Sequence, residues 1–269
     1  MEFADPYKTE RVLVVVRTYP TPARTGVEVS CTAAISEDGK RWLRLFPIPY
    51  RFLASDQRFR KYQWIDVAMR KSTKDARPES YRIQEDSIRI VSQELSSANA
   101  WSARKDWIVP LKSHCMCCLM RELDEKKHPT LGFFKPKAIT KFTIQPDDAS
   151  WSASQLEILR QKDLFVQGPE VELQKVPYKF VYSFTCDHAS CRGHNMSCTD
   201  WEMGESWRSW KEKYGDDWKD KFLQRYEKEM IHEKDTHFYV GTIHRHPKNW
   251  IIIGLFYPPV DPQASLLGL

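Results

Sequence analysis

A short segment in the second half of the chain carries five cysteine and histidine side chains within 13 residues. The segment reads CDHASCRGHNMSCTDWE over residues 186–202. So many thiol and imidazole groups in one stretch are typical of a metal site, because structural zinc takes four such ligands in a tetrahedron. An ion held here would fix the elements that enter and leave the segment, so this feature constrains the fold around it.

The spacing within this segment favours one compact site. Its three thiols and the imidazole of His194 recur at intervals of three to five residues, and Gly193 lets the backbone turn sharply. We therefore expect a tight turn in which three thiolates and one imidazole converge on zinc, with an iron–sulfur cluster as the alternative cofactor. The predicted ligands are Cys186, Cys191, His194 and Cys198.

The ligand set of this site is open to alternatives. His188 lies within the segment and is a spare candidate. Cys198 could instead face the core from the start of the following helix, since free cysteine is among the most buried residue types. In that case Cys31 or Cys117 would supply the fourth ligand and would join two distant parts of the chain.

The cysteines also indicate the compartment. Six of the seven fall into two clusters, at residues 115–118 and 186–198, and only Cys31 lies outside them. Clustered thiols favour metal binding in a reducing compartment over disulfides. The chain has no apolar run of about 18 residues, and its first residues make a poor signal peptide. We therefore expect a cytoplasmic protein without membrane contact.

The N-terminal half predicts a series of short β-strands. Apolar and β-branched runs alternate there with turn signals, including Asp38-Gly39, which is typical of a hairpin. The expected strands cover residues 11–18, 27–35, 41–46, 62–70 and 82–91. Short strands with turns between them, and no long amphipathic helix among them, favour a small closed barrel.

Part of this half resembles a known family. Residues 27–49 are similar to the pattern that marks the first barrel of prokaryotic dual OB-domain proteins, although Ala33-Ala34 stands where that pattern usually has a glycine. The matching residues are Val29, Cys31, Thr32, Ala33, Ile35, Trp42, Leu43 and Arg44. The resemblance implies a barrel of OB type and brings no catalytic signature.

The C-terminal half predicts helices and strands around the metal segment. A strand at residues 175–185 runs directly into it, and Thr199 or Asp200 is expected to cap the helix that leaves it. That helical region carries aromatic residues at intervals of three or four, which is typical of an amphipathic face. Two strands, at 237–244 and 249–256, follow.

The predicted fold class is therefore α+β, with two domains. The first, residues 1–148, is a basic OB-like small β-barrel. The second, residues 149–269, is an α+β domain that carries the metal site.

The charge distribution favours a polyanion as partner. Residues 17–82 hold 14 Lys/Arg against 7 Asp/Glu, whereas residues 199–235 hold 8 against 11. A basic OB-like barrel with aromatic side chains predicts a module that binds single-stranded DNA or RNA, with zinc as a structural ion. The expected nucleic-acid contacts are Arg17, Arg41, Trp42, Arg44 and Arg51.

Two other functions remain open at this point. One is a protein-interaction protein in which zinc is purely structural. The other is a metal-dependent nuclease or hydrolase, in which Asp200 and Glu202 would bind a cation or act as general base. Arg208, His244 or His246 would then neutralise phosphate, but the chain contains no P-loop and no dinucleotide-binding glycine motif.

Overall fold

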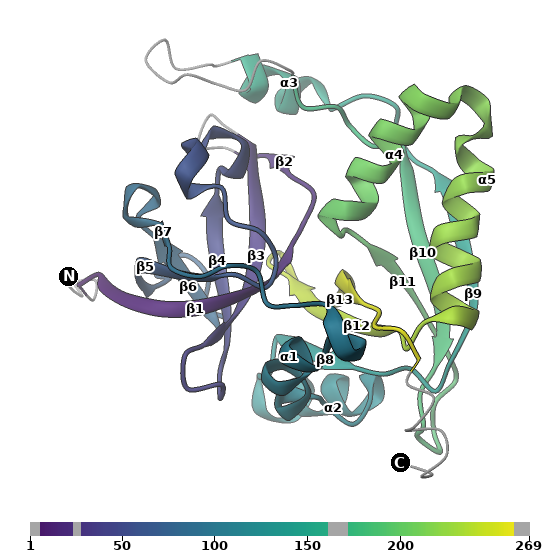
Figure 1. Ribbon diagram of the computed structural model, residues 1–269, viewed down its shortest axis with the longest axis horizontal. Coiled ribbons are helices and arrows are strands. Elements are labelled where there is room, and N and C mark those ends of the chain that lie inside the picture. Colours follow the sequence, from purple (N-terminus) through teal and green to yellow (C-terminus); the bar gives the residue numbers. More distant parts are fainter. Residues whose placement is uncertain (1–5, 24–27, 161–171, 261–269) are drawn as a thin grey trace.

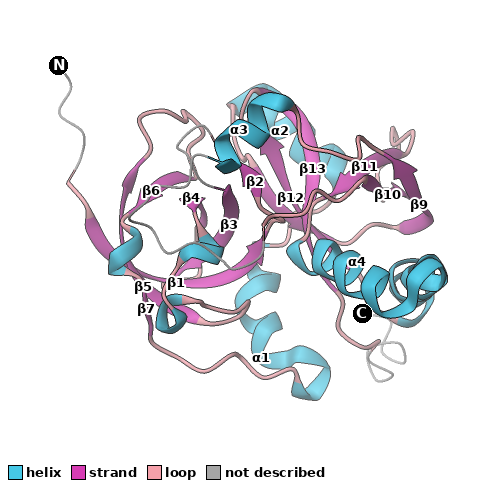
Figure 2. Cartoon of the chain, turned by 90° about the horizontal axis from the view of Figure 1, so that it is seen from above, coloured by secondary structure: helices cyan, strands magenta, loops and turns pink. Residues whose placement is uncertain are grey.

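Two β-sheets organise the chain. The computed structural model describes residues 6–23, 28–160 and 172–260. Figure 1 shows the strands of the N-terminal part, in purple and blue, beside those of the C-terminal part, in teal to yellow. Figure 2 shows the same division from above.

The first sheet is built from short strands joined by turns and single 3-10 turns. Its strands are β1 (Lys8–Arg17), β2 (Thr21–Pro22), β3 (Glu28–Ser36), β4 (Trp42–Ile48), β5 (Trp64–Lys71), β6 (Ser80–Ile83) and β7 (Arg89–Ile90). Its 3-10 turns are η1 (Tyr50–Phe52), η2 (Ser55–Gln57) and η3 (Glu85–Ser87). Val27, the first residue of the OB-like pattern, lies outside the described residues.

These strands close into a barrel, called the first barrel below. They pair in the order β1-β3-β4-β6-β5, and β5 also pairs with β1, which closes the ring. The β4–β6 pair is parallel, and the other pairs around the ring are antiparallel. If the five strands of the ring (β1, β3, β4, β5 and β6) are counted as first to fifth along the chain, the ring runs first-second-third-fifth-fourth-first. This is the strand order of an OB-type barrel. The predicted OB-like barrel is confirmed.

The long apolar run in β1 is explained by burial on both of its faces. Side chains alternate across a strand. Val12 and Val14 point into the first barrel, whereas Leu13 and Val15 join a second apolar cluster outside it. All four are fully buried, because the second half of the chain covers the outer face of this strand.

The second half contains six strands and the longer helices. Its strands are β8 (Leu131–Phe134), β9 (Ala138–Pro146), β10 (Tyr178–Thr185), β11 (His194–Cys198), β12 (His237–Ile243) and β13 (His246–Phe256). Its helical segments are α2 (Met116–Lys126), α3 (Ala153–Arg160), α4 (Trp201–Tyr214), η5 (Gly215–Asp217), α5 (Trp218–Leu223) and the π-helical η6 (Gln224–Glu233). The connection from the first barrel holds α1 (Ala98–Ile108) and η4 (Val109–Leu111).

The second sheet repeats the strand order of the first barrel and is called the second barrel below. Its strands pair in the order β8-β12-β13-β11-β10-β9, with β11 and β13 parallel. Only residues 135–137 separate β8 from β9, so one stretch of chain borders both ends of the sheet, as β1 does in the first barrel. The second unit is α+β as predicted. Its repeated order is consistent with the two-barrel family that residues 27–49 resemble.

The pairing also bears on the division of the chain. β8 and β9 precede residue 148, yet they belong to the second sheet. The domain limit at 148–149 stays a prediction, because strand pairing describes where a segment lies and not whether a domain folds alone.

The helices after the metal segment cover the second barrel with one apolar face. Residues four apart on a helix share a face. Trp218, Phe222, Tyr226 and Met230 follow this spacing and are buried, the first three within the core of the second barrel. Figure 1 shows α4 and α5 lying along the outside of β9, β10 and β11. The expected aromatic stripe is therefore core.

A buried polar network fastens the two barrels together. The Arg44 guanidinium on β4 donates to the Ser80 hydroxyl at 3.1 Å and to the Thr130 hydroxyl and carbonyl at 3.0 and 2.7 Å. The Glu79 carboxylate accepts from the Thr130 amide at 3.0 Å. Arg44 is 2% exposed, so these bonds satisfy a charge that has left water.

Asp75 anchors the outer end of this network, and Asp75→Asn is expected to cost about 2 kcal/mol of stability at pH 7. Burial alone would raise the pKa of Asp75, but hydrogen bonds from Arg77 and Ser80 outweigh it and hold the pKa well below its usual range. Arg77 in turn donates to the Thr242 carbonyl of the second barrel. A carboxyl with a depressed folded pKa contributes stability above its unfolded pKa, and this contribution is lost as pH falls.

Urea unfolding between pH 2 and 7 measures this effect. The wild type is expected to lose stability steadily below about pH 4, and Asp75→Asn to show a flatter acid limb. Asp56→Asn, in an exposed turn, is the matched control and should follow the wild type. If the free energy of unfolding falls equally steeply with decreasing pH in the wild type and in Asp75→Asn, the Asp75 carboxylate does not have the stabilising role proposed for it.

Candidate functional site

Four side chains of the second barrel form a group with the composition of a zinc site. The ligand atoms of Cys117, Cys186, Cys191 and His194 all lie within 4.8 Å of one another. The Cys117 Sγ and His194 Nε2 atoms are 3.3 Å apart. Tetrahedral ligands at zinc–sulfur distances of 2.3 Å lie about 3.8 Å apart, so the group fits such an ion with small adjustments.

Three local features bring these ligands together. Cys186 directly follows β10, His194 begins β11, and the two strands are antiparallel neighbours. The loop between them turns at Gly193, whose φ of +88° favours glycine. The Cys186 amide donates to the Cys191 Sγ at 3.2 Å, which holds the loop closed. Cys117 comes from the first turn of α2, so an ion would tie that helix to the β10–β11 hairpin.

The electrostatics of the group suit a dication. The Cys186 amide lowers the pKa of Cys191, while burial raises the pKa of Cys186 and of Cys117. Burial also lowers the pKa of His194, which favours the neutral imidazole that a metal ligand requires. Several thiols packed together resist joint ionisation, and a bound zinc ion would remove that cost by stabilising the thiolates.

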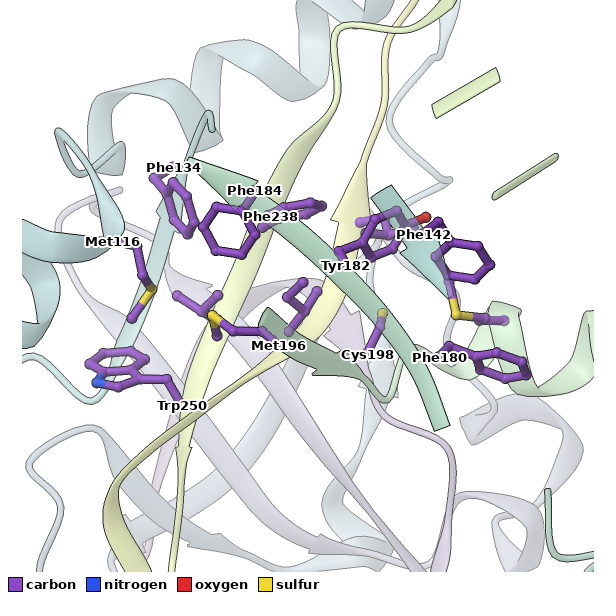
Figure 3. Close-up of a cluster of buried hydrophobic side chains, with 14 of the residues drawn as sticks. Met116, Phe134, Phe142, Phe180, Tyr182, Phe184, Met196, Cys198, Phe238 and Trp250 are labelled. Carbon is purple, nitrogen blue, oxygen red and sulfur yellow. The ribbon is translucent and has the colours of Figure 1, made fainter. Parts of the chain in front are cut away.

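The structure does not bring Cys198 to this group, and the predicted ligand set is corrected there. Residues 194–198 form a strand and not the expected tight turn. At about 3.3 Å per residue, Cys198 lies roughly 13 Å along β11 from His194. Its sulfur is buried among aromatic side chains of the core (Figure 3). Cys117, one of the open alternatives, takes its place.

The other two alternatives lie elsewhere. His188 contacts the Ser190 hydroxyl through Nδ1 at 2.9 Å. Cys31 lies on β3 of the first barrel, where burial raises its pKa. A second thiol pair lies next to the metal group: Cys115 caps α2, and its Sγ is 2.8 Å from that of Cys118.

Two of the predicted nucleic-acid contacts lie between the barrels, where Arg44 is buried and Trp42 is half-buried. Arg44 is committed to the buried network between the barrels, so it is not a surface contact. Trp42 packs edge-on against Tyr239 with ring centroids 6.1 Å apart, as part of the apolar cluster between the barrels. Both residues are expected as contacts from charge and strand placement, but the second barrel covers the face of β4 that carries them.

The remaining three predicted contacts have different surroundings. Arg41 lies in the exposed turn before β4 and pairs with Glu10 at 3.2 Å. Arg51 pairs with the buried Glu28 at 3.1 Å. Arg17 ends β1 and lies between two rings, with its guanidinium carbon 3.7 Å from the centroid of Tyr50 and 4.2 Å from that of Trp201.

A cavity of about 360 Å³ opens beside Arg17, where the two barrels meet the connection that holds α1. Its lining combines cationic and aromatic side chains with two carboxylates, Glu94 and Glu202. The cations are Arg17, Arg60, Lys61 and Arg104. The aromatic residues are Tyr62, Trp101 and Tyr257. Sequence reasoning missed this site, although the run Arg58-Phe59-Arg60-Lys61 was a visible basic signal.

The backbone around this cavity is strained. Tyr62 and Trp101 both line it, and both have left-handed backbone, with φ of +65° and +64°. Asn99 and Ala100, which precede Trp101, have φ of +49° and +48°. Left-handed conformation costs L-residues about 1–2 kcal/mol each, and such residues cluster at functional sites.

Lys61 and two carboxylates close the floor of the cavity. The Lys61 ammonium lies 3.0 Å from Asp200 and 3.2 Å from Glu202. Asp200 also caps α4 by accepting from the Glu202 amide at 2.8 Å, and it accepts from the Leu255 amide at 2.9 Å. This carboxylate is 3% exposed, so the expected cap also joins both barrels.

Two of the three groups proposed for phosphate in the nuclease hypothesis have acidic partners. Arg208 pairs with Glu205 one turn away on α4, at 2.7 Å. His244 lies 3.3 Å from Asp75, at the outer end of the polar network. His246 is exposed at the start of β13.

The strand order and the metal group define the class of this protein: two OB-type barrels, the second with a candidate Cys3His centre. Residues 112–268 match the family model described as Domain of unknown function (DUF8757), and residues 8–110 match Domain of unknown function (DUF8758). Because the first match spans more than half of the chain, the protein belongs to the DUF8757 family.

Other comparisons add little. No curated protein matches the chain. Among solved structures, the crystal structure of the tetrameric p202 HIN2 aligns with 97% of this chain and 96% of that chain, at 8% identity and a TM-score of 0.32. The assignment of the barrels to the OB type rests on their strand pairing. None of the described helices is long and apolar enough to span a membrane.

Proposed function

We propose that this protein binds single-stranded nucleic acid at the junction of its two barrels and that a zinc ion stabilises the second barrel. The observation that carries the proposal is the cavity, whose lining holds four cationic side chains against two carboxylates, together with three aromatic rings. Proteins that hold single strands without sequence preference combine these two features, because cations contact phosphates and aromatic rings stack on bases.

The charge near the cavity supports a polyanion. Residues 50–61 join β4 to β5 and hold four Lys/Arg against one Asp. Arg58 and Arg60 within them are exposed. Among the described residues, no carboxylate lies within ion-pair distance of Arg58 or Arg60. The contacts we assign are Arg17, Arg41, Arg51, Arg58 and Arg60, without Trp42 and Arg44, which lie between the barrels.

The metal centre has the donor set of a structural ion. Structural zinc sites use four protein ligands, whereas catalytic sites keep one position for water. Three cysteines and one histidine supply four donors, and the imidazole favours zinc over an iron–sulfur cluster. When bound, the ion would fasten α2 to the β10–β11 hairpin. A cytoplasmic location stays a prediction that agrees with these reduced thiols.

Binding of a fluorescent 20-nucleotide single strand, measured by anisotropy at several salt concentrations, tests this proposal. With five cationic contacts, log K is expected to fall against log salt with a slope of about −3.5. Arg58→Ala/Arg60→Ala should reduce the slope by about 1.4 and weaken binding roughly tenfold. Arg121→Ala/Arg245→Ala removes two exposed arginines of the second barrel and should leave both unchanged.

Two outcomes would count against the proposal. Absence of binding to DNA and RNA at low salt would favour the protein-interaction alternative. Equal losses in the two double variants would show that general charge, and not the junction, carries the affinity.

A further inference from the structure

The cavity between the barrels has the features of a site for one small ligand. Ligand pockets occupy roughly 300–1,000 Å³, lie often at domain interfaces and combine apolar walls with a few polar groups. This cavity has about 360 Å³ and is walled by both barrels and by the connection between them. Its size suits one nucleotide better than a longer stretch of strand.

The four cations of the cavity differ in how far they are already neutralised. Lys61 is paired with Asp200 and Glu202, and Arg104 is paired with Glu94 at 2.7 Å. Within the described part of the chain, Arg17 and Arg60 have no carboxylate within ion-pair distance. An entering anion would therefore find two cations whose charge is not matched by a contacting acid.

Arg17 is the more unusual of the two. Its guanidinium is held between the rings of Tyr50 and Trp201, and one of its nitrogens donates to the Phe59 carbonyl at 3.2 Å. The Nε atom is buried and has no hydrogen-bond partner among the described residues. Burial lowers the pKa of Arg17, because the charged guanidinium loses contact with water. A bound anion would offset this loss of hydration.

The aromatic side of the cavity is fixed in place. Trp101 lies 5.2 Å from the ring of Tyr257 and 6.0 Å from that of Tyr62. Arg104 lies over both Trp101 and Tyr62, at 4.7 and 4.2 Å. The left-handed backbone at residues 99–101 places the indole here at an energetic cost, and such strain is common where a side chain must be held for binding.

We propose that this cavity binds one nucleotide, with the phosphate at Arg17 and Arg60 and the base against Trp101 and Tyr257. The inference rests on the proposed function, because the cavity adjoins the same basic segment. The inference is more specific than the proposed function, since it assigns the pocket to a single nucleoside phosphate. The same chemistry is offered by the 5′-phosphorylated end of a strand and by a free mononucleotide.

Calorimetric titration with AMP, adenosine and inorganic phosphate tests the pocket itself. AMP is expected to bind saturably, and adenosine and phosphate each at least tenfold more weakly, because each retains one half of the contacts. Arg60→Gln should weaken AMP about tenfold and Arg121→Gln should not. Arg60 is exposed, so its loss leaves the core intact. Trp101→Phe should reduce the change of tryptophan fluorescence on AMP binding, and any remainder would come from Trp201 beside Arg17.

Binding of 10-nucleotide strands with and without a 5′-phosphate distinguishes a strand end from a free mononucleotide as the ligand of the pocket. Tighter binding of the phosphorylated strand, competed by AMP, assigns the pocket to strand ends. Equal binding of both strands together with AMP binding assigns it to a free nucleotide. If AMP, GMP, CMP and UMP all fail to bind at about 5 mM while a 20-nucleotide strand binds, the pocket inference is overturned and the proposed function stands. If neither binds, both are overturned.

Discussion

Cys117→Ser is expected to release the metal and to lower the free energy of unfolding by about 4 kcal/mol. Structural zinc contributes roughly 10–16 kcal/mol of apparent binding free energy in small domains, and a site that loses one of four thiolate or imidazole donors holds the ion far less tightly. The second barrel has its own apolar core, so the loss should be a fraction of that total. Elemental analysis should show one zinc per wild-type chain and a small fraction of this in the variant.

Thermal unfolding gives the second measurement. For a chain of this size, a loss of 4 kcal/mol corresponds to a fall of roughly 10 °C in Tm. A chelator added to the wild type should produce a similar fall, and chelator added to Cys117→Ser should change little. A wild-type absorption band near 400 nm would identify an iron–sulfur cluster and contradict zinc.

Cys198→Ala is the matched control for this prediction. Cys198 lies in the predicted ligand set, but its sulfur belongs to the aromatic core of the second barrel. The variant should keep its zinc and lose only about 1 kcal/mol through a small cavity. Loss of zinc from Cys198→Ala together with its retention in Cys117→Ser would restore the ligand set that spacing alone suggested.

The contrast between these two cysteines shows what a sequence can say about a site. Residues 186–194 are close in the chain, so their spacing predicted three ligands from local geometry. The fourth depends on whether residues 194–198 turn or extend, which is decided by pairing of β11 with β10 and β13. Cys117 lies 69 residues before Cys186, and only tertiary packing brings α2 to the hairpin.

The same distinction applies to the fold. Turn signals and apolar alternation predicted the strands of the first barrel, because these features are local. The contact between the barrels was not predictable in this way. Arg44 and Trp42 are polar or amphipathic residues on an outer face of β4, a pattern that also fits a solvent-exposed binding surface. Arg44 is buried and Trp42 is half-buried because the second barrel covers this face, and no local pattern places that barrel there.

Lys61→Met is expected to cost about 3–5 kcal/mol, because it leaves Asp200 buried at the junction without its cation. Lys61 contacts both Asp200 and Glu202, and its side chain is 9% exposed. Methionine keeps most of the side-chain volume, so the effect reports charge more than packing. The loss should appear in urea unfolding at pH 7. Lys248→Met removes an exposed pair with Asp124 and should have no measurable effect.

The pH dependence of the Lys61→Met variant distinguishes an uncompensated carboxylate from a general packing defect. Burial already raises the pKa of Asp200, and Lys61 opposes that rise. Without the lysine, the folded pKa should rise further above the unfolded value. A carboxyl with a raised folded pKa destabilises the fold increasingly as pH rises, so the variant should lose more stability at pH 8 than at pH 5. Asp200→Asn in the same chain keeps the cap acceptor, removes the charge and should recover about 1–3 kcal/mol. A loss below 1 kcal/mol that is independent of pH would mean that this ion pair does not hold the two barrels together.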